Sequence, residues 1–139
     1  MTPVRLSRWP WWRRWFGRRS ERAAARFLRK LGYRIFAANV ADAAGELDLI
    51  ALDGEVLVIV EVRSTSGVDL ERTAASIDYR KQKKIADAAL RFLCRHRLLE
   101  NVAVRFDVLI VAWPPVAKSP AIHHYPNAFE STGRFQFHS

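Results

Sequence analysis

Three carboxylates and one arginine lie within two short apolar runs, and carboxylate side chains can bind divalent cations. Glu46 and Asp48 lie at the start of the first run, and Glu61 and Arg63 lie at the end of the second. Like charges gathered in a half-buried site are unfavourable unless something compensates them. Hard cations such as Mg²⁺ prefer carboxylate oxygens and bind through few of them. We therefore expect a divalent-cation site among these acids.

The two apolar runs are predicted to form a β-hairpin, which would bring the acids together. They are separated by Asp53-Gly54, the residue pair preferred in type I′ turns. A two-residue loop at this point pairs Glu46 with Glu61 and places Asp48 diagonally opposite Glu61, at about 7–8 Å. Side chains alternate along strands, so the charged residues share one face. The other face is wholly apolar and carries Leu47, Leu49, Ala51, Val56, Val58, Val60 and Val62.

Helices and further strands are predicted on both sides of this hairpin. A helix begins at the N-cap residue Ser20 and ends at Gly32. A second helix, 74–98, follows a polar loop and permits a parallel crossover between the third and fourth strands. The remaining strands are expected at 33–40, 102–112 and 122–125. The element order α-β-β-β-α-β predicts an α/β domain with one mixed sheet.

Glu21 is a further acid whose position is unusual. It precedes Ala24 by three residues and Leu28 by seven, so it shares the apolar face of the first helix. A carboxylate on that face could reach toward the acidic end of the sheet. Alternatively, it could simply complement the helix N-terminus.

Length and composition limit the classes of protein to consider. A chain of 139 residues, half of them hydrophobic, suits a single domain. We expect a basic Trp/Arg-rich tail over residues 1–19, a domain over 20–130 and a second tail over 131–139. No apolar run reaches the roughly 18 residues of a transmembrane helix, and one cysteine, Cys94, excludes an intramolecular disulfide. The expected location is the cytoplasm.

The positive charge is concentrated at one end of the chain. Residues 1–40 contain eleven Lys or Arg and one acid, whereas residues 41–139 contain twelve Lys or Arg and thirteen acids. Such an asymmetry indicates a polyanionic partner, either nucleic acid or an anionic membrane surface. Nucleic acid, with DNA first, is the preferred partner. The cations expected to contact it are Arg13, Arg14, Arg18 and Arg19 in the tail, and Arg80, Lys81, Lys83 and Lys84 in the second helix.

An ordered series of motifs resembles the YraN-like family of small bacterial proteins. The segments are GRRSERAAARFLRKLGY from Gly17, Asn39, GELDLIA from Gly45, VEVR from Val60, RKQKKIADAAL from Arg80, RFDV from Arg105 and HYPNAFE from His124. That family is similar in turn to the PD-(D/E)XK nuclease superfamily, which includes junction resolvases and RecB-type nuclease domains. The resemblance implies a restriction-endonuclease-like αβββαβ core, in agreement with the order expected from the residues.

The resemblance also assigns roles to individual residues. Asp48 and Glu61 take the positions of the two metal-binding acids, so the implied cofactor is Mg²⁺ or Mn²⁺, which activates water for attack on a phosphodiester. Glu21 matches a helical glutamate of the resolvase-like branch, and Gln82 matches a polar position of the RecB-like branch. Glu46 is a further auxiliary acid. A homodimer follows only by analogy with junction resolvases.

Arg63 departs from the superfamily pattern, because a lysine is expected there. An arginine stays charged and cannot act as a base, although it can still neutralise a transition state. Three functions therefore remain open. The first is a metal-dependent endonuclease acting on branched or single-stranded DNA. The second is a catalytically silent nucleic-acid-binding module of the same fold, and the third is a membrane-surface adaptor acting through the Trp/Arg tail.

Overall fold

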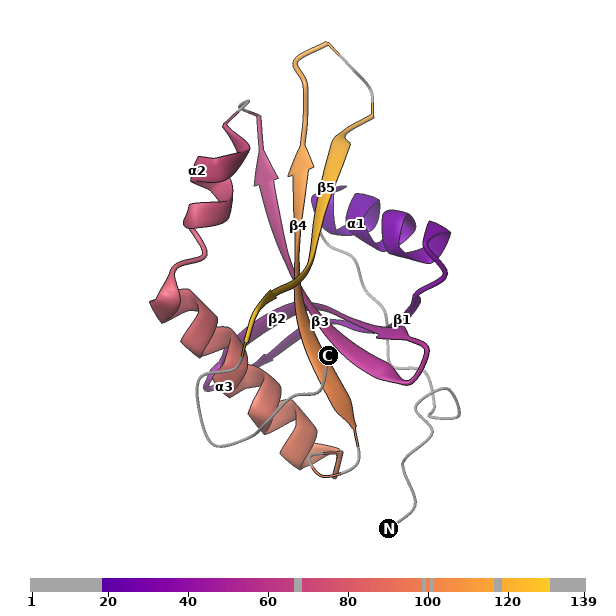
Figure 1. Ribbon diagram of the computed structural model, residues 1–139, viewed down its shortest axis with the longest axis vertical. Helices are drawn as coiled ribbons and strands as arrows, with labels where there is room; N and C mark the ends of the chain where they lie inside the picture. Colours follow the sequence, from indigo (N-terminus) through magenta and orange to yellow (C-terminus); the bar gives the residue numbers. More distant parts are fainter. Residues whose placement is uncertain (1–18, 67–68, 99, 101, 117–118, 131–139) are drawn as a thin grey trace.

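Five strands form one mixed sheet and follow one another across it in chain order (Figure 1). The computed structural model describes residues 19–66, 69–98, 100, 102–116 and 119–130. Neighbouring strands are antiparallel, except that β3 and β4 are parallel. This confirms the predicted α/β class with a mixed sheet. The strands are β1 (Arg34–Asp42), β2 (Gly45–Asp53), β3 (Val56–Thr65), β4 (Ala103–Ala112) and β5 (Ala121–Phe129).

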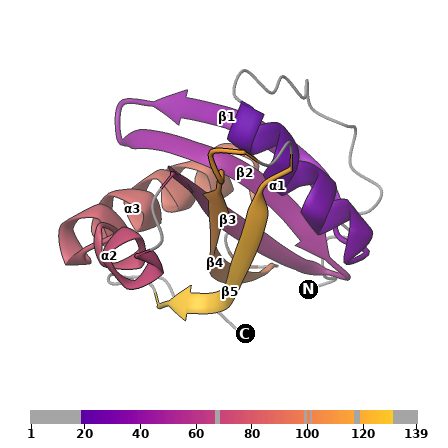
Figure 2. The same cartoon turned by 90° about the horizontal axis from the view of Figure 1, so that it is seen from above.

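Helices cover both faces of the sheet (Figure 2). α1 (Arg19–Lys30) packs on one face, where Ala24, Ala25 and Leu28 join a buried cluster with side chains of β1 to β4. α2 (Leu70–Ala75) and α3 (Tyr79–Arg95) lie on the other face and form the larger cluster. The two faces of β2 and β3 are therefore both buried, which explains why these strands are almost continuously apolar. The sheet and its helices reproduce the expected αβββαβ order and the further strand expected at 122–125, and α2 is added to them.

The turn between β2 and β3 differs from the predicted one by one residue. Asp53 pairs with Val56, so the two loop residues are Gly54 and Glu55 rather than Asp53 and Gly54. Gly54 has a φ of +62° and Glu55 does not have a positive φ, which is the pattern of a type II′ turn with glycine first. The register therefore shifts by two residues. Because side chains alternate with period two, each side chain of the hairpin keeps its predicted face unless the strand itself is irregular.

One such irregularity occurs near the start of β2. Leu47 belongs to the cluster on the α3 face, whereas the prediction placed it on the opposite face with Leu49. Asn39, on the neighbouring strand between the pairs Ala38–Leu49 and Val40–Leu47, has a φ of +53°. The local change in backbone direction accounts for the switch of Leu47 to the α3 face. The irregular position lies directly beside Asp48.

The region expected to be a polar loop and one long helix contains two helices instead. Asp69 caps α2 by accepting a hydrogen bond from the backbone of Arg72, and Asp78 caps α3 by accepting one from the backbone of Lys81. An aspartate in this role favours a new helix start, because it satisfies an amide without an intrahelical partner. The predicted helix 74–98 is therefore interrupted at Ser76–Asp78. This interruption fixes where Lys81 lies on α3.

The first helix is tied to the sheet by Ser20, which the sequence predicted as its N-cap. Ser20 instead lies within the described helix, and its hydroxyl donates to Ser64 Oγ at 2.8 Å. The indole Nε1 of Trp113 donates to the same hydroxyl, also at 2.8 Å. The guanidinium of Arg19 lies 3.6 Å from the centre of a Trp113 ring. Among the described helices, none is both long and apolar enough to cross a lipid bilayer.

The last strand extends beyond its predicted end and contains a bulge. Phe106 pairs with Phe129 and Val108 pairs with Tyr125, so a four-residue step along β5 faces a two-residue step along β4. Asn127 within this bulge has a φ of +52°. Pro126 cannot donate to a sheet hydrogen bond, which suits it to a bulge. The extra residues move the backbone of β5 away from that of β4 at this point.

Candidate functional site

Asp48 and Glu61 lie where the pairing of β2 with β3 stops. The last paired residues are Leu49 and Val60, and Asp48 and Glu61 come one position further along their strands. The observed register therefore places the two acids opposite each other, not diagonally as the predicted turn required. Beyond the last pair, the side chain of Asp48 takes the place of a backbone hydrogen-bond partner from β2, because its Oδ2 accepts a hydrogen bond of 2.9 Å from the backbone of Val62.

The two carboxyl groups form one coupled pair. Glu61 is 4% exposed. Burial and, after it, the negative charge of Asp48 raise the pKa of Glu61 to about 8, although Lys81 and Arg63 act in the opposite direction. A side-chain hydrogen bond with Asp48 also raises the pKa of Glu61. The pair thus holds fewer negative charges than two free carboxylates would.

Two cations contact the same oxygen of Glu61. Arg63 Nη2 lies 3.3 Å from Glu61 Oε2, and Lys81 Nζ lies 3.7 Å from it. Both side chains remain about one-third exposed, so each can reach a ligand from the solvent side. Arg63 Nε is buried and donates no hydrogen bond to any residue that the structure describes. Arg63 therefore has a donor left over after its contact with Glu61.

Lys81 is the residue whose position the sequence analysis did not foresee. It was expected to contact nucleic acid as part of a basic run, yet the structure places its ammonium group beside Glu61. Asp78 is the N-cap of α3 and lies three residues before Lys81. The position of this cap therefore decides which side of the helix Lys81 occupies. Asp78 is an N-cap residue type within the expected helix, and this pattern could have indicated the position of Lys81.

The remaining acids of the prediction lie in different surroundings. Glu46 is exposed and pairs with Ala41 at the outer part of β2. Glu21 is 3% exposed on α1, which packs on the opposite face from α3. Over the described ranges, no three His, Cys, Asp or Glu side chains are gathered closely enough to hold a metal ion by themselves. Within the described part of the chain, Asp48 and Glu61 are thus the adjacent carboxylates that a cation could use.

Two carboxylates are nevertheless a suitable donor set for Mg²⁺. This ion keeps several water ligands and commonly binds through one or two carboxylates together with oxygens of a substrate phosphate. Asp48 and Glu61 supply hard oxygen donors next to each other, and a cation between them would relieve the repulsion that raises the pKa of Glu61. The residues present therefore fit a Mg²⁺ or Mn²⁺ ion that is shared with a substrate.

The other predicted contact residues lie on α3, on α1 or outside the described residues. Gln82 follows Lys81 on α3, and its Nε2 donates to the backbone oxygen of Ile77 at 3.1 Å. Arg80, Lys83 and Lys84 are exposed, and Lys83 forms an ion pair with Asp87 at 3.5 Å. Arg19 lies on α1, whereas Arg13, Arg14 and Arg18 fall outside the described residues.

A second buried acid, Asp107, lies on the opposite face of the sheet. Its carboxylate is 0% exposed and accepts hydrogen bonds from Arg105 Nε at 2.9 Å and Nη2 at 3.1 Å. Its Oδ2 lies 2.7 Å from His124 Nε2, and its Oδ1 accepts a 2.9 Å hydrogen bond from the backbone of Asn127. The carboxylate therefore connects β4 to both sides of the bulge in β5.

Comparison with known proteins places the chain in a family. The model of the uncharacterised protein family UPF0102 matches residues 20–111. The chain belongs to the UPF0102 family. It is 42% identical over 125 residues to a UPF0102 protein of Rhodopirellula baltica, covering 88% of this chain and 74% of that protein. It is also 38% identical over 117 residues to a UPF0102 protein of Pelotomaculum thermopropionicum, covering 84% and 97% respectively.

The UPF0102 match confirms the resemblance drawn from the sequence motifs. Residues 20–111 include Asp48 and Glu61, both cations that contact Glu61, and Asp107. They end before β5. The segment that the UPF0102 model matches therefore contains the whole carboxylate pair with its charged surroundings.

Proposed function

We propose that this UPF0102 protein is a divalent-metal-dependent endonuclease that hydrolyses phosphodiester bonds in branched or single-stranded DNA. The observation that carries the proposal is the adjacent pair Asp48 and Glu61, half-buried to buried at the point where β2 and β3 part, with two cations on Glu61. A site of this kind combines donors for a metal with positive groups for a phosphate. The αβββαβ order and the similarity to PD-(D/E)XK nucleases support the same activity.

Each residue of the site has a distinct task in this proposal. Asp48 and Glu61 hold Mg²⁺ or Mn²⁺, whose contribution is to polarise the scissile phosphate and to acidify water. Arg63, whose side chain is about one-third exposed, binds a phosphate oxygen and stabilises the charge that develops there. Lys81 takes the role that the arginine cannot perform, because an ammonium group can exchange a proton with water whereas a guanidinium cannot.

Metal binding is the first test of the proposal. We expect calorimetric titration with Mg²⁺ or Mn²⁺ to give a binding isotherm for the wild-type chain and none for Asp48→Asn, because the variant loses a charged oxygen donor. Glu100→Gln is the matched control, since this exposed acid precedes β4 and lies outside the carboxylate pair. Equal binding by wild type and Asp48→Asn would show that the metal binds elsewhere.

A second candidate function has support in the same contacts. Because Lys81 and Arg63 already compensate Glu61, the pair can persist without metal, as it would in a silent DNA-binding module. That module would bind DNA in a salt-dependent manner. It would give no metal isotherm and no cleavage, so the titration above separates the two functions.

Lys81 provides a prediction that distinguishes its role from general DNA affinity. We expect Lys81→Met to lower kcat about 100-fold, the lower limit for loss of a positioned proton-transfer group, with a much smaller change in KM. Lys83→Met is the control, because Lys83 is exposed on the same helix and pairs with Asp87 rather than with Glu61. Initial rates on a flapped DNA would be measured across a pH range. Equal losses of kcat in both variants would assign Lys81 to ordinary phosphate contact.

A further inference from the structure

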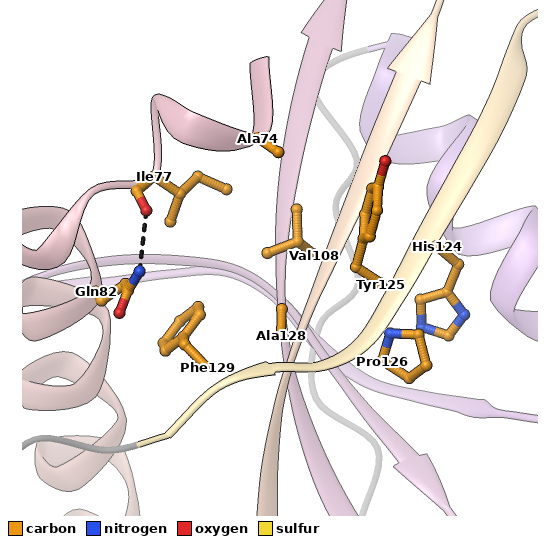
Figure 3. Close-up of a pocket in the computed structure, with 9 residues that line it drawn as sticks. All are labelled: Ala74, Ile77, Gln82, Val108, His124, Tyr125, Pro126, Ala128 and Phe129. Carbon is orange, nitrogen blue, oxygen red and sulfur yellow. Dashed lines mark hydrogen bonds between the residues drawn. The ribbon is translucent and has the colours of Figure 1, made fainter. Parts of the chain in front are cut away.

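A cavity of about 380 Å³ is lined by Val108, the residue of β4 that pairs with Glu61 (Figure 3). It lies between α2 and α3 on one side and β4 and β5 on the other. Its size falls in the range of pockets for small organic ligands. The side chains used in the argument below are Ile77, Gln82, Val108, Tyr125, Pro126 and Phe129.

The register of the sheet places this cavity directly beside Glu61. Glu61 of β3 pairs with Val108 of β4, and Val108 pairs with Tyr125 of β5. Paired residues point to the same face, so the three side chains form one row across the sheet. Neighbouring strands lie about 4.8 Å apart, and the row therefore spans roughly 10 Å. One nucleotide can bridge such a distance from its phosphate to its base. Gln82 also connects the cavity with the carboxylate pair, because it lines the cavity and directly follows Lys81, which contacts Glu61.

The walls of the cavity suit a flat, partly polar ring. Tyr125 is 38% exposed and, like Phe129, lines the cavity (Figure 3). Phe129 also stacks on Phe106, with ring centres 4.9 Å apart. Aromatic side chains of this kind are the usual surfaces on which unpaired bases stack. Gln82 is held by the hydrogen bond that it donates to Ile77. Its Oε1 accepts no hydrogen bond from the described residues, which leaves an acceptor for an exocyclic amino group.

We infer that this cavity receives one unpaired nucleobase of the strand whose phosphate lies at Asp48 and Glu61. The inference rests on the proposed nuclease function and names the feature of the substrate that the site selects. A base can enter only where it is not paired and stacked in a duplex, because extrusion from a duplex costs free energy. The cavity thus favours single-stranded arms and branch points over continuous duplex, and Tyr125 is the residue that contacts the base.

The test measures binding in the absence of metal, so that no cleavage occurs. A flapped DNA carries a single abasic residue that is moved, position by position, along the single-stranded arm, and its affinity is measured by fluorescence anisotropy in EDTA. For the wild-type chain we expect one position at which the abasic residue weakens binding about tenfold, which is within the effect of one base–aromatic stack. Tyr125→Ala should abolish this penalty, and Tyr125→Phe should retain it.

Tyr79→Ala is the matched control, because Tyr79 is 64% exposed at the start of α3 and does not line the cavity. It should keep the positional penalty. The inference is overturned if no position is penalised in the wild type, or if Tyr125→Ala keeps the penalty. Base-dependent binding without cleavage in Mg²⁺ or Mn²⁺ would overturn the nuclease function alone. Cleavage without a positional penalty would overturn the base site alone, and absence of DNA binding would overturn both.

Discussion

Cleavage by Glu61→Gln is expected to be at least about a thousandfold slower than cleavage by the wild-type chain. Glu61 is the more buried member of the carboxylate pair and contacts both cations of the site. A metal held by this pair contributes several kcal/mol to the stabilisation of transition-state charge, and about 4 kcal/mol corresponds to a factor of a thousand. The measurement is kcat/KM on a flapped DNA in saturating Mn²⁺.

The glutamine variant should fold, which makes its loss of activity informative. Glutamine has nearly the same shape, and it removes a buried carboxyl that Asp48 and the low-dielectric surroundings oppose in its charged form. Thermal unfolding in EDTA would check that the melting temperature is not reduced. Glu100→Gln should retain full activity as the matched control. If Glu61→Gln kept more than a tenth of the wild-type rate in the folded state, Glu61 would not be a metal ligand.

The second large effect concerns stability. Asp107→Asn is expected to reduce the free energy of unfolding at pH 7 by about 3 kcal/mol, because it removes a fully buried charge that accepts two hydrogen bonds from Arg105 and leaves Arg105 with its ion pair to the more exposed Asp53. Arg105 also donates to Asp53 at the end of β2, at 3.0 Å, and to Tyr33 just before β1, at 2.6 Å, so the loss extends to both of these segments. Urea unfolding would measure it. Asp87→Asn, which alters an exposed acid, should change stability by less than about 0.5 kcal/mol.

The same carboxylate predicts how stability depends on pH. Burial alone would raise the pKa of Asp107, but hydrogen bonds from His124, Arg105 and the backbone of Asn127 outweigh it and lower the pKa below 3.8. A group with a lowered pKa in the folded state stabilises the fold above its unfolded pKa, and this stabilisation is lost as the pH falls through the folded value. The difference between wild type and Asp107→Asn should therefore narrow below about pH 4. A difference that stayed constant down to pH 2 would contradict this assignment.

The sequence predicted the sheet and its layers well, because these depend on hydrophobic periodicity. The apolar runs around Asp53-Gly54 indicated a hairpin, and the helix after it indicated a parallel crossover, which the pairing of β3 with β4 confirms. The predicted position of the turn was wrong by one residue. An Asp-Gly pair and a glycine in the first position of a type II′ turn both place Gly54 at a positive φ, so local preference alone could not decide between them.

Other parts of the site depend on contacts between distant residues. The approach of Lys81 to Glu61 requires both the break before Asp78 and the packing of α3 on the sheet. The cavity beside Tyr125 requires the bulge in β5, which is stabilised by Asp107 twenty residues before Asn127. Periodicity over a short window cannot reveal either feature, because each arises only after the tertiary fold has formed.

The bulge in β5 also couples the two faces of the sheet thermodynamically. Asp107 binds Asn127 from the α1 face, while Tyr125 on the same bulged stretch faces the α3 side. Any ligand that is bound in the cavity and favours this backbone conformation must, by reciprocity, strengthen the Asp107 network. Substitutions in this network, on the opposite face of the sheet from the carboxylate pair, can thus alter affinity without touching the ligand. The buried network is in this sense a distal determinant of recognition.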